Sequence, residues 1–242
     1  MTPSTVAIVL AAGVGSRLRP HTDNLPKCLV PIGAASILER AVNTLESCGI
    51  QRLIVSTGYL DHTVREALAS ARIEVAFVHN PDFAETQNVV SFERALHAVR
   101  PGERVVKIDG DVLFERTIID ALWAANTSAV AVDRSQTLGA EEMKVLTRAG
   151  KIARFGKTLD PATAHGESIG IECFLAVDVA AVTAAMSAAI HAGRTNVYYE
   201  DVYNDVVERV PMTAVDVSPR DWTEIDDADD LARAIVRFGG RD

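Results

Sequence analysis

A glycine-rich segment close to the start of the chain carries cations at a spacing that suits phosphate. Gly13 and Gly15 follow the first apolar run, and Arg17, Arg19 and Lys27 come after them. Small residues let backbone N–H groups approach oxygen atoms closely, arginine offers a planar fork to phosphate oxygens, and lysine offers a point charge. The segment therefore predicts a phosphate site. The competing interpretation is a surface turn with solvated cations.

Two well-known phosphate loops do not fit this segment. The P-loop pattern GxxxxGK[ST] is absent at the required spacing. The dinucleotide fingerprint GxGxxG begins with Gly13 and Gly15 but has Leu18 at its sixth position, and the second strand pattern ends at Thr57 without an acidic residue to bind a ribose. An NAD(P)-dependent oxidoreductase is therefore disfavoured.

Carboxylates gather at two other places in the sequence. Asp109 and Asp111 follow a β-branched run, and Glu224 and Asp226 are two residues apart, which puts them on one face of an extended chain. Hard oxygen ligands beside a polyphosphate would hold Mg²⁺. The alternatives are an ordinary loop aspartate for Asp111 and a helix N-cap for Asp226.

A third segment, Tyr198-Tyr199-Glu200-Asp201, places aromatic rings beside carboxylates. This combination suits a quaternary or primary ammonium group through cation–π and Coulomb attraction. A hydroxyl-rich ligand such as an inositol phosphate could instead donate hydrogen bonds to the same carboxylates. The alternative is the start of an amphipathic helix, with tyrosine in the core and the acids in the first turn.

The first half of the chain alternates β-branched runs with amphipathic patterns. The expected strands are residues 5–11, 52–57, 74–79 and 104–108, and the expected helices are residues 37–48, 63–71 and 89–99. Such alternation predicts βαβ units and a parallel sheet with right-handed crossovers. Ligands of these sheets bind at the carboxyl ends of the strands, where both the glycine-rich segment and Asp109 to Asp111 fall.

After residue 111 the pattern changes to closely spaced strands. They are expected at 128–132, 144–147, 152–155, 168–176 and 213–217, with helices at 178–192, 200–210 and 228–238. We expect a small antiparallel or mixed insertion on the same sheet. Because the sequence contains no repeat or linker, it predicts one α/β domain over 1–242. The change of pattern at residue 111 divides this domain into two halves, 1–111 and 112–242.

Composition limits the classes of partner. The chain has 24 Lys and Arg against 33 Asp and Glu, a net charge of −9, which disfavours nucleic acid. No apolar stretch approaches the ~20 residues that span a bilayer, and the first residues carry no basic signal-peptide region. We therefore expect a cytoplasmic protein without membrane insertion. Cys28, Cys48 and Cys173 form no CxxC pair, so neither a disulfide framework nor a zinc site is indicated.

The glycine-rich segment resembles the signature of the nucleotidyltransferase superfamily that makes NDP-sugars and CDP-alcohols. The pattern GxGxRxxPxTxxxPK is filled by Gly13, Gly15, Arg17, Pro20, Thr22, Pro26 and Lys27. The resemblance covers nearly the whole chain and implies a Rossmann-like, doubly wound, mostly parallel mixed sheet. It also implies that the loop wraps a triphosphate, with Arg17 and Lys27 stabilising charge on the α-phosphate and on departing pyrophosphate. The nucleotide-binding residues implied in this way are Leu10, Ala11, Ala12, Gly13, Gly15, Ser16, Arg17, Lys27, Gln87, Asn88, Ser91 and Asp109.

Within that superfamily the chain resembles the phosphocholine cytidylyltransferase-like branch. Asp111 matches the metal-binding aspartate, and Glu224 with Asp226 matches a second, C-terminal metal element. Asn80, Asn88 and Ser91 also fit the branch, and the resemblance implies that Gln87, Asn88 or Ser91 lies near the base.

The resemblance also implies that residues 1–111 form the nucleotide-binding half of the domain and residues 112–242 the half that binds the acceptor of the transferred nucleotidyl group. It assigns Lys157 to the acceptor phosphate, for which the alternative is an ordinary hairpin lysine, and it makes Glu167 to Ile171 an acceptor-facing strand. With the segment from Tyr198 to Asp201, the predicted acceptor-binding residues are Lys157, Glu167, Tyr198, Tyr199, Glu200 and Asp201.

Together these patterns predict a Mg²⁺-dependent cytidylyltransferase. It would transfer CMP from CTP to a phosphomonoester or phosphonate such as phosphocholine or 2-aminoethylphosphonate, and release pyrophosphate. Arg17, Lys27 and Lys157 would be the catalytic residues and Asp111, Glu224 and Asp226 the metal ligands. The alternatives are a sugar-1-phosphate or inositol-1-phosphate nucleotidyltransferase that uses CTP, UTP or another NTP, and a nucleotide-sensing homologue without turnover. A homodimer is compatible with either.

Overall fold

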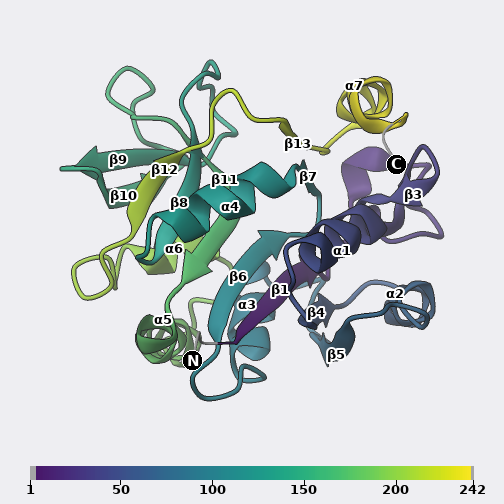
Figure 1. The fold of residues 1–242 in the computed structure, drawn as a ribbon, viewed down its shortest axis with the longest axis horizontal. Coiled ribbons are helices and arrows are strands. Elements are labelled where there is room, and N and C mark those ends of the chain that lie inside the picture. Colours follow the sequence, from purple (N-terminus) through teal and green to yellow (C-terminus); the bar gives the residue numbers. More distant parts are fainter. Residues whose placement is uncertain (1–3, 241–242) are drawn as a thin grey trace.

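A computed structural model describes residues 4–240 of the chain, and a nine-stranded sheet forms its centre (Figure 1). In spatial order the strands are β5 (Glu74–His79), β4 (Arg52–Thr57), β1 (Thr5–Ala11), β6 (Arg104–Asp109), β11 (Glu167–Phe174), β8 (Ala129–Asp133), β12 (Thr213–Asp216), β10 (Lys151–Gly156) and β9 (Lys144–Arg148).

The sheet is mixed, as expected. The four strands from β5 to β6 pair in parallel, and so do β8 and β12. β11 runs antiparallel to both β6 and β8, and β10 runs antiparallel to β9 and β12. The carboxyl ends of β1 and β6 therefore meet at one edge of the sheet, which brings the glycine-rich segment beside Asp111.

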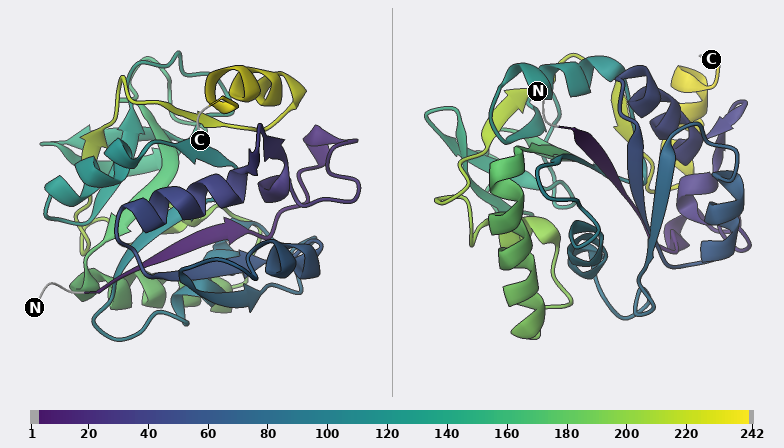
Figure 2. Two further views of the ribbon diagram at one scale, coloured as in Figure 1. Left: turned by 45° about the vertical axis from the view of Figure 1, so that its right-hand side comes forward. Right: turned by 60° about the horizontal axis from the view of Figure 1, so that its bottom comes forward.

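Helices cover both faces of the sheet. Alternate residues of β1 point to opposite sides, so they contribute to a core on each face. On one face, Ala7 and Val9 join the core with α1 (Ile37–Ser47), α2 (Asp61–Ala67) and α4 (Arg116–Ala124). On the other face, Val6 and Ile8 pack with α3 (Asn88–Leu96), α5 (Ala176–His191) and α6 (Tyr199–Tyr203). In Figure 2, left, α1 lies above β1 and the green helix α5 lies below it.

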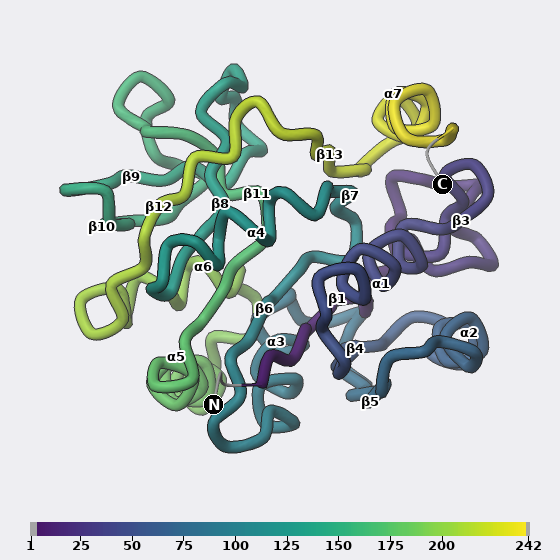
Figure 3. The backbone as a smooth tube through the Cα atoms, in the orientation of Figure 1, coloured from purple at the N-terminus to yellow at the C-terminus, as the bar shows by residue number. Residues whose placement is uncertain are grey.

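A third, smaller core joins the C-terminal segment to the glycine-rich segment. Here β13 (Trp222–Glu224) pairs antiparallel with β7 (Val112–Phe114), and α7 (Ala228–Phe238) lies against the hairpin of β2 (Pro31–Ile32) and β3 (Ala35–Ser36). The residues of this core include Leu18, Leu113, Ile225, Leu231 and Phe238. The segment from β13 to α7 (yellow in Figure 3) is thus held against the N-terminal part of the chain.

Several expected boundaries agree with the structure, including those of β1, β4, β5 and α7. The helix expected over 200–210 is wrong in length, since α6 ends at Tyr203. The side chain of Asn204 hydrogen-bonds both backbone groups of Phe155 and so ties the chain after α6 to β10. The backbone continues beyond it in isolated turns, in which the N–H of Val207 donates to the carbonyl of Tyr203. Helix α4 was not expected from the sequence. Within residues 4–240, no helix is long and apolar enough to cross a membrane.

Candidate active site

The glycine-rich segment folds into a loop at the carboxyl end of β1 that is shaped around Lys27. Gly15 has a φ of 66°, and a Cβ atom built there would lie 2.7 Å from Cβ of Lys27, so both the conformation and the space require glycine. The hydroxyl of buried Thr22 donates a hydrogen bond of 2.8 Å to the carbonyl of Gly15. Buried Leu18 holds the loop to the third core.

Three carboxylates converge opposite this loop. Asp111 follows β6, Glu224 ends β13, and Asp226 comes two residues later. Glu224 pairs with Val112 in register, and the backbone N–H of Ile225 donates to the carbonyl of Asp111 at 3.1 Å. One oxygen from each carboxylate lies within 4.8 Å of the others.

Two cations from the loop enter the carboxylate cluster. Nζ of Lys27 lies 2.7 Å from Oδ2 of Asp111 and 2.7 Å from Oδ1 of Asp226, and the Arg17 guanidinium lies 2.8 Å from the same Asp226 oxygen. Burial alone would lower the pKa of Lys27, but the two carboxylates outweigh it and raise that pKa. Burial alone would raise the pKa of Asp226, but Lys27 and Arg17 lower it. An oxygen-only set of three carboxylates suits a hard divalent cation such as Mg²⁺.

The alternative role that the sequence left open for Asp226 is excluded by the neighbouring residue. The N-cap of α7 is Asp227, whose side chain accepts from the backbone N–H groups of Asp229 and Asp230. The carboxylate of Asp226 points instead to Lys27 and Arg17.

Two buried side chains hold the carboxylate of Asp109. The hydroxyl of Tyr199 donates to Oδ2 of Asp109 at 2.7 Å, and Nζ of Lys107 lies 2.9 Å from Oδ1. Lys107 also lies 3.1 Å from Glu172 and sits over the Tyr199 ring. Burial alone would lower the pKa of Lys107, but Asp109, Glu172 and Glu200 raise it, so the buried lysine stays charged.

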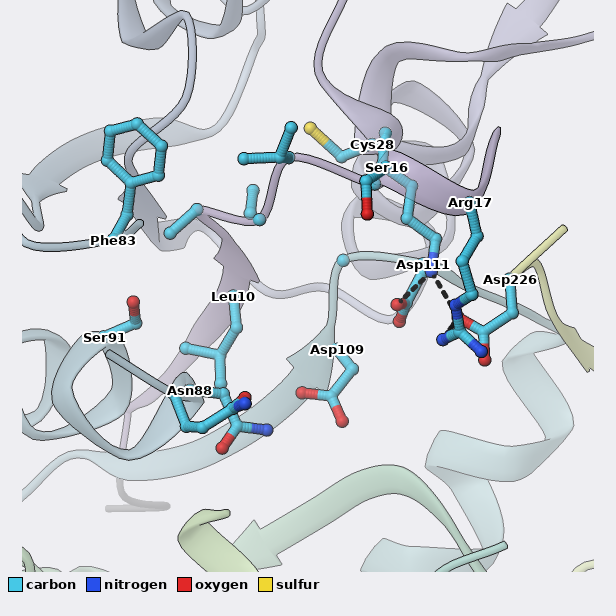
Figure 4. Close-up of a pocket in the computed structure, with 18 of the residues that line it drawn as sticks. Leu10, Ser16, Arg17, Cys28, Phe83, Asn88, Ser91, Asp109, Asp111 and Asp226 are labelled. Atoms are coloured by element: carbon cyan, nitrogen blue, oxygen red, sulfur yellow. Dashed lines mark hydrogen bonds and ion pairs between the residues drawn. The ribbon is translucent and has the colours of Figure 1, made fainter. Parts of the chain in front are cut away.

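A cleft of about 520 Å³ opens above these groups. In Figure 4, Arg17, Asp111 and Asp226 lie at one end, Phe83, Asn88 and Ser91 lie toward the other, and Leu10 and Asp109 lie between them. All twelve residues predicted to bind nucleotide line this cleft, together with Asp111, Lys157, Tyr198, Glu224 and Asp226.

Sequence reasoning missed six lining residues, of which Val14, Cys28 and Gly110 belong to segments that were already predicted to form the site. The other three are Phe83, Ala84 and Thr86. They belong to the turn that joins β5 to α3, where no motif marks them. The available signal was positional, since this turn leaves the carboxyl end of a parallel strand.

A second pocket of about 340 Å³ adjoins the cleft on the side of β11. Four of the predicted acceptor residues line it: Lys157, Glu167, Tyr198 and Glu200. Nζ of Lys157 lies 4.8 Å from the centre of the Tyr198 ring and 3.7 Å from a carboxylate oxygen of Glu141. Burial raises the pKa of Glu167 to about 7 and that of Glu200 to about 8.

The other two predicted acceptor residues, Tyr199 and Asp201, line neither cavity, which corrects that expectation. The Tyr199 ring is fully buried and packs against Phe92 and Tyr203. The Asp201 carboxylate accepts the backbone N–H of Tyr198 and so caps α6. Because Tyr199 lies in the core and Asp201 caps the helix, only Tyr198 and Glu200 of this four-residue run line the second pocket. For these two residues, the helix-start interpretation is the correct one.

The chain is similar in sequence to known nucleotidyltransferases. The family model of the MobA-like NTP transferase domain matches residues 7–149. The 2-aminoethylphosphonate cytidylyltransferase of Lancefieldella rimae is 25% identical over 229 residues, which cover 94% of this chain and 91% of that protein. The CMP-5'-(3-aminopropyl)phosphonate synthase of Streptomyces rubellomurinus is 36% identical over 139 residues, 55% of this chain but only 22% of that protein.

Solved structures agree on the fold. The CTP:phosphocholine cytidylyltransferase of Streptococcus pneumoniae superposes with a TM-score of 0.77 and 20% identity, over 96% of this chain and 99% of that one. This likeness identifies the mixed sheet and its helices as the Rossmann-like α/β fold of nucleotidyltransferases. With the family model matching more than half of its length, the chain belongs to the MobA-like NTP transferase family, and it is a nucleotidyltransferase.

Proposed function

We propose that the chain is a Mg²⁺-dependent cytidylyltransferase that transfers CMP from CTP to an aminoalkylphosphonate or a phosphocholine-like phosphomonoester. The observation that carries this proposal is the cluster of Arg17, Lys27, Asp111 and Asp226 at the mouth of an acidic second pocket. The names of the relatives from Lancefieldella and Streptomyces support the choice of CTP and of a phosphonate acceptor.

The described residues act in this proposal as one nucleotidyltransferase domain. Arg17 and Lys27 come from the predicted nucleotide-binding half, whereas Glu224 and Asp226 come from the predicted acceptor half. Because both halves supply the same cluster, neither half would hold the triphosphate and its metal alone.

Asp111, Glu224 and Asp226 would hold the Mg²⁺, which when bound neutralises charge on the polyphosphate and on the three carboxylates. The backbone of the glycine-rich loop would bind phosphate oxygens, and Arg17 and Lys27 would neutralise charge that develops on the α-phosphate and on pyrophosphate. Phe83, Asn88 and Ser91 lie toward the opposite end of the cleft, where the base would bind.

The reaction needs no general base in the protein. An oxygen of the phosphate or phosphonate acceptor is already anionic, so it can attack the α-phosphorus in line while the bond to pyrophosphate breaks. Catalysis then consists of positioning and of charge stabilisation. Lys157 faces both the cleft and the second pocket, and it would hold the acceptor phosphate between them.

The second pocket suits a cationic group on the acceptor. Glu200 is buried with 5% of its surface exposed, and its Oε2 finds no hydrogen-bond partner within residues 4–240. A buried acceptor atom without a donor is costly. An ammonium group in the pocket would supply that donor and the opposite charge, with the Tyr198 ring beside it.

A grid of substrates tests the proposal. Each of the four NTPs is combined with 2-aminoethylphosphonate, phosphocholine, phosphoethanolamine, inositol 1-phosphate and glucose 1-phosphate, and pyrophosphate release is measured with Mg²⁺. We expect turnover with CTP and an acceptor that carries an amino or trimethylammonium group. Preference for inositol 1-phosphate or glucose 1-phosphate would contradict the acceptor assignment. Nucleotide binding without pyrophosphate release in the whole grid would favour the nucleotide-sensing alternative.

A further inference from the structure

Two of the proposed metal ligands are carried by a very short strand. Glu224 ends β13, which has three residues and pairs only with β7 in the part of the chain that the structure describes, and Asp226 follows it. The segment reaches this position from β12, across the top of the sheet (Figure 3). Oxygens of Glu224, Asp226 and Asp111 lie within 4.8 Å of one another. Lys27 bridges Asp111 and Asp226, but no such ion pair holds Glu224 in the part of the chain that the structure describes. Because like charges at this distance repel, a further restraint on the three-residue strand helps to keep Glu224 beside the other two carboxylates.

Asp133 supplies a buried connection between the main sheet and this segment. It ends β8 and has 3% of its surface exposed. Its Oδ2 accepts the indole N–H of Trp222 at 2.6 Å, and its Oδ1 accepts the hydroxyl of Ser218 at 2.8 Å. Oδ1 also accepts the backbone N–H and the hydroxyl of Ser135, both at 2.7 Å.

These four hydrogen bonds leave Asp133 well satisfied as an anion. Burial alone would raise the pKa of Asp133, but the hydrogen bonds from Ser135, Trp222 and Ser218 outweigh it and lower the pKa. Hydrogen bonds to an ionised acceptor are stronger than those between neutral groups. Two of the donors, Ser218 and Trp222, belong to the segment that leads into the metal ligands.

The position of Trp222 is transmitted to the carboxylates over a short, ordered path. Trp222 pairs with Phe114, Glu224 pairs with Val112, and the side chain of Ile225 is fully buried. A shift of Trp222 would therefore move Glu224 and Asp226 relative to Asp111, whose position is fixed by β6 and β7.

We propose that Asp133 is a positioning residue of the metal site, and that its hydrogen bond to the Trp222 indole fixes the segment carrying Glu224 and Asp226 against Asp111. The proposal rests on the proposed function, because it assumes that these carboxylates bind a divalent cation. It assigns to Asp133 no contact with substrate or metal.

Binding of Mn²⁺ alone, measured by electron paramagnetic resonance of the free ion, tests the proposal without requiring turnover. Trp222→Phe removes the donor but keeps a ring in the core, and Asp133→Asn removes the charge of the acceptor. We expect each variant to bind Mn²⁺ about 5- to 20-fold more weakly than the unmodified chain. The loss of affinity in the double variant should be smaller than the product of the two single losses, because both changes weaken the same hydrogen bond.

Asp178→Asn is a matched control. The Asp178 carboxylate accepts the hydroxyl of Ser128 at 2.6 Å, at the opposite end of β8 and far from β13 in the topology. This variant should lose stability without losing Mn²⁺ affinity. If Asp133→Asn fails to fold, Trp222→Phe carries the test. Unchanged Mn²⁺ affinity in Trp222→Phe would overturn the inference.

Failure of the proposed function has a different signature. An unmodified chain that binds Mn²⁺ but transfers no cytidylyl group contradicts the proposed reaction and leaves the positioning role supported or refuted by the variants. An unmodified chain that binds no Mn²⁺ overturns the metal site and the inference together.

Discussion

The hydroxyl of Tyr199 donates a 2.7 Å hydrogen bond to Asp109 from a ring that is completely buried. The second Asp109 oxygen lies 2.9 Å from Lys107, which is also fully buried. Tyr199 thereby connects helix α6 to Asp109, the last residue of β6, at the floor of the cleft. An aromatic residue that sequence assigns to the acceptor thus supports a carboxylate that lines the cleft.

Tyr199→Phe tests this assignment, because it removes only the hydroxyl. A hydrogen bond to a charged group contributes about 1.5–3 kcal/mol, so we expect kcat/KM for CTP to fall by about tenfold or more. The KM for the acceptor should not change selectively. Tyr203→Phe is the control: its hydroxyl is buried in the same aromatic cluster and has no hydrogen-bond partner within residues 4–240. A selective rise in the acceptor KM of Tyr199→Phe would restore the original assignment.

Asp111→Asn should remove most of the turnover while the fold survives. Asp111 is the carboxylate that lies directly after the central strand β6, and its charge would be shared by Lys27 and the metal. Losing an electrostatic contact of this kind typically costs about 10²–10³-fold in kcat. Pyrophosphate release is measured over a Mg²⁺ titration, with circular dichroism as the check on folding. Near-normal turnover at saturating Mg²⁺ would contradict the metal assignment.

Lys27→Ala should act chiefly on kcat. A charge that grows on the departing pyrophosphate interacts with the ammonium group more strongly in the transition state than in the ground state. Arg19→Ala is a suitable control, since Arg19 pairs at 3.4 Å with half-exposed Asp23 and does not line the cleft. Steady-state kinetics in both substrates would separate the effects. A change confined to the acceptor KM would show that Lys27 is misplaced in the proposal.

The sequence predicts the parts of this site that depend on local patterns. Glycine spacing, cations and the position after β1 predict the loop. The two-residue spacing predicts that Glu224 and Asp226 lie together, and oxygens of the two side chains lie within 4.8 Å of each other. Contacts between distant segments leave no such pattern. The hydrogen bond from Trp222 to Asp133 joins residues 89 positions apart.

The prediction that the whole segment from Tyr198 to Asp201 faces the acceptor agrees only in part with the structure, for a related reason. Two tyrosines followed by two acids are compatible with a ligand cage and with a helix start, and only the position of α6 against Phe92 and Asp109 distinguishes them. The outcome is divided residue by residue: Tyr198 and Glu200 face the second pocket, while Tyr199 and Asp201 do not. Period alone cannot resolve a helix of five residues.

Glu200→Gln should weaken cationic acceptors selectively. The amide keeps the shape of the side chain but cannot ionise, whereas Glu200, with its pKa raised to about 8, can lose its proton when an ammonium group binds beside it. The kcat/KM for an ammonium-bearing acceptor should therefore fall about tenfold more than that for inositol 1-phosphate. Asp201→Asn is the matched control, since its carboxylate caps α6 outside the pocket. Equal losses for charged and neutral acceptors in Glu200→Gln would favour a purely structural role.

Glu167→Gln should raise the free energy of unfolding at pH 8 and leave it almost unchanged at pH 4. Glu167 has 8% of its surface exposed, and burial raises its pKa from 4.5 to about 7. Between these two values the folded chain keeps a proton that the unfolded chain releases, so stability falls as the pH rises through this window. Above pH 7 both states are ionised and the folded state retains the full penalty, which for a pKa raised from 4.5 to about 7 is on the order of 3 kcal/mol at ~1.4 kcal/mol per pKa unit. Urea denaturation of both proteins at several pH values measures the difference, and Glu85→Gln, an exposed glutamate, should give a flat difference. A stability difference between Glu167→Gln and the unmodified chain that is independent of pH would contradict the raised pKa of Glu167.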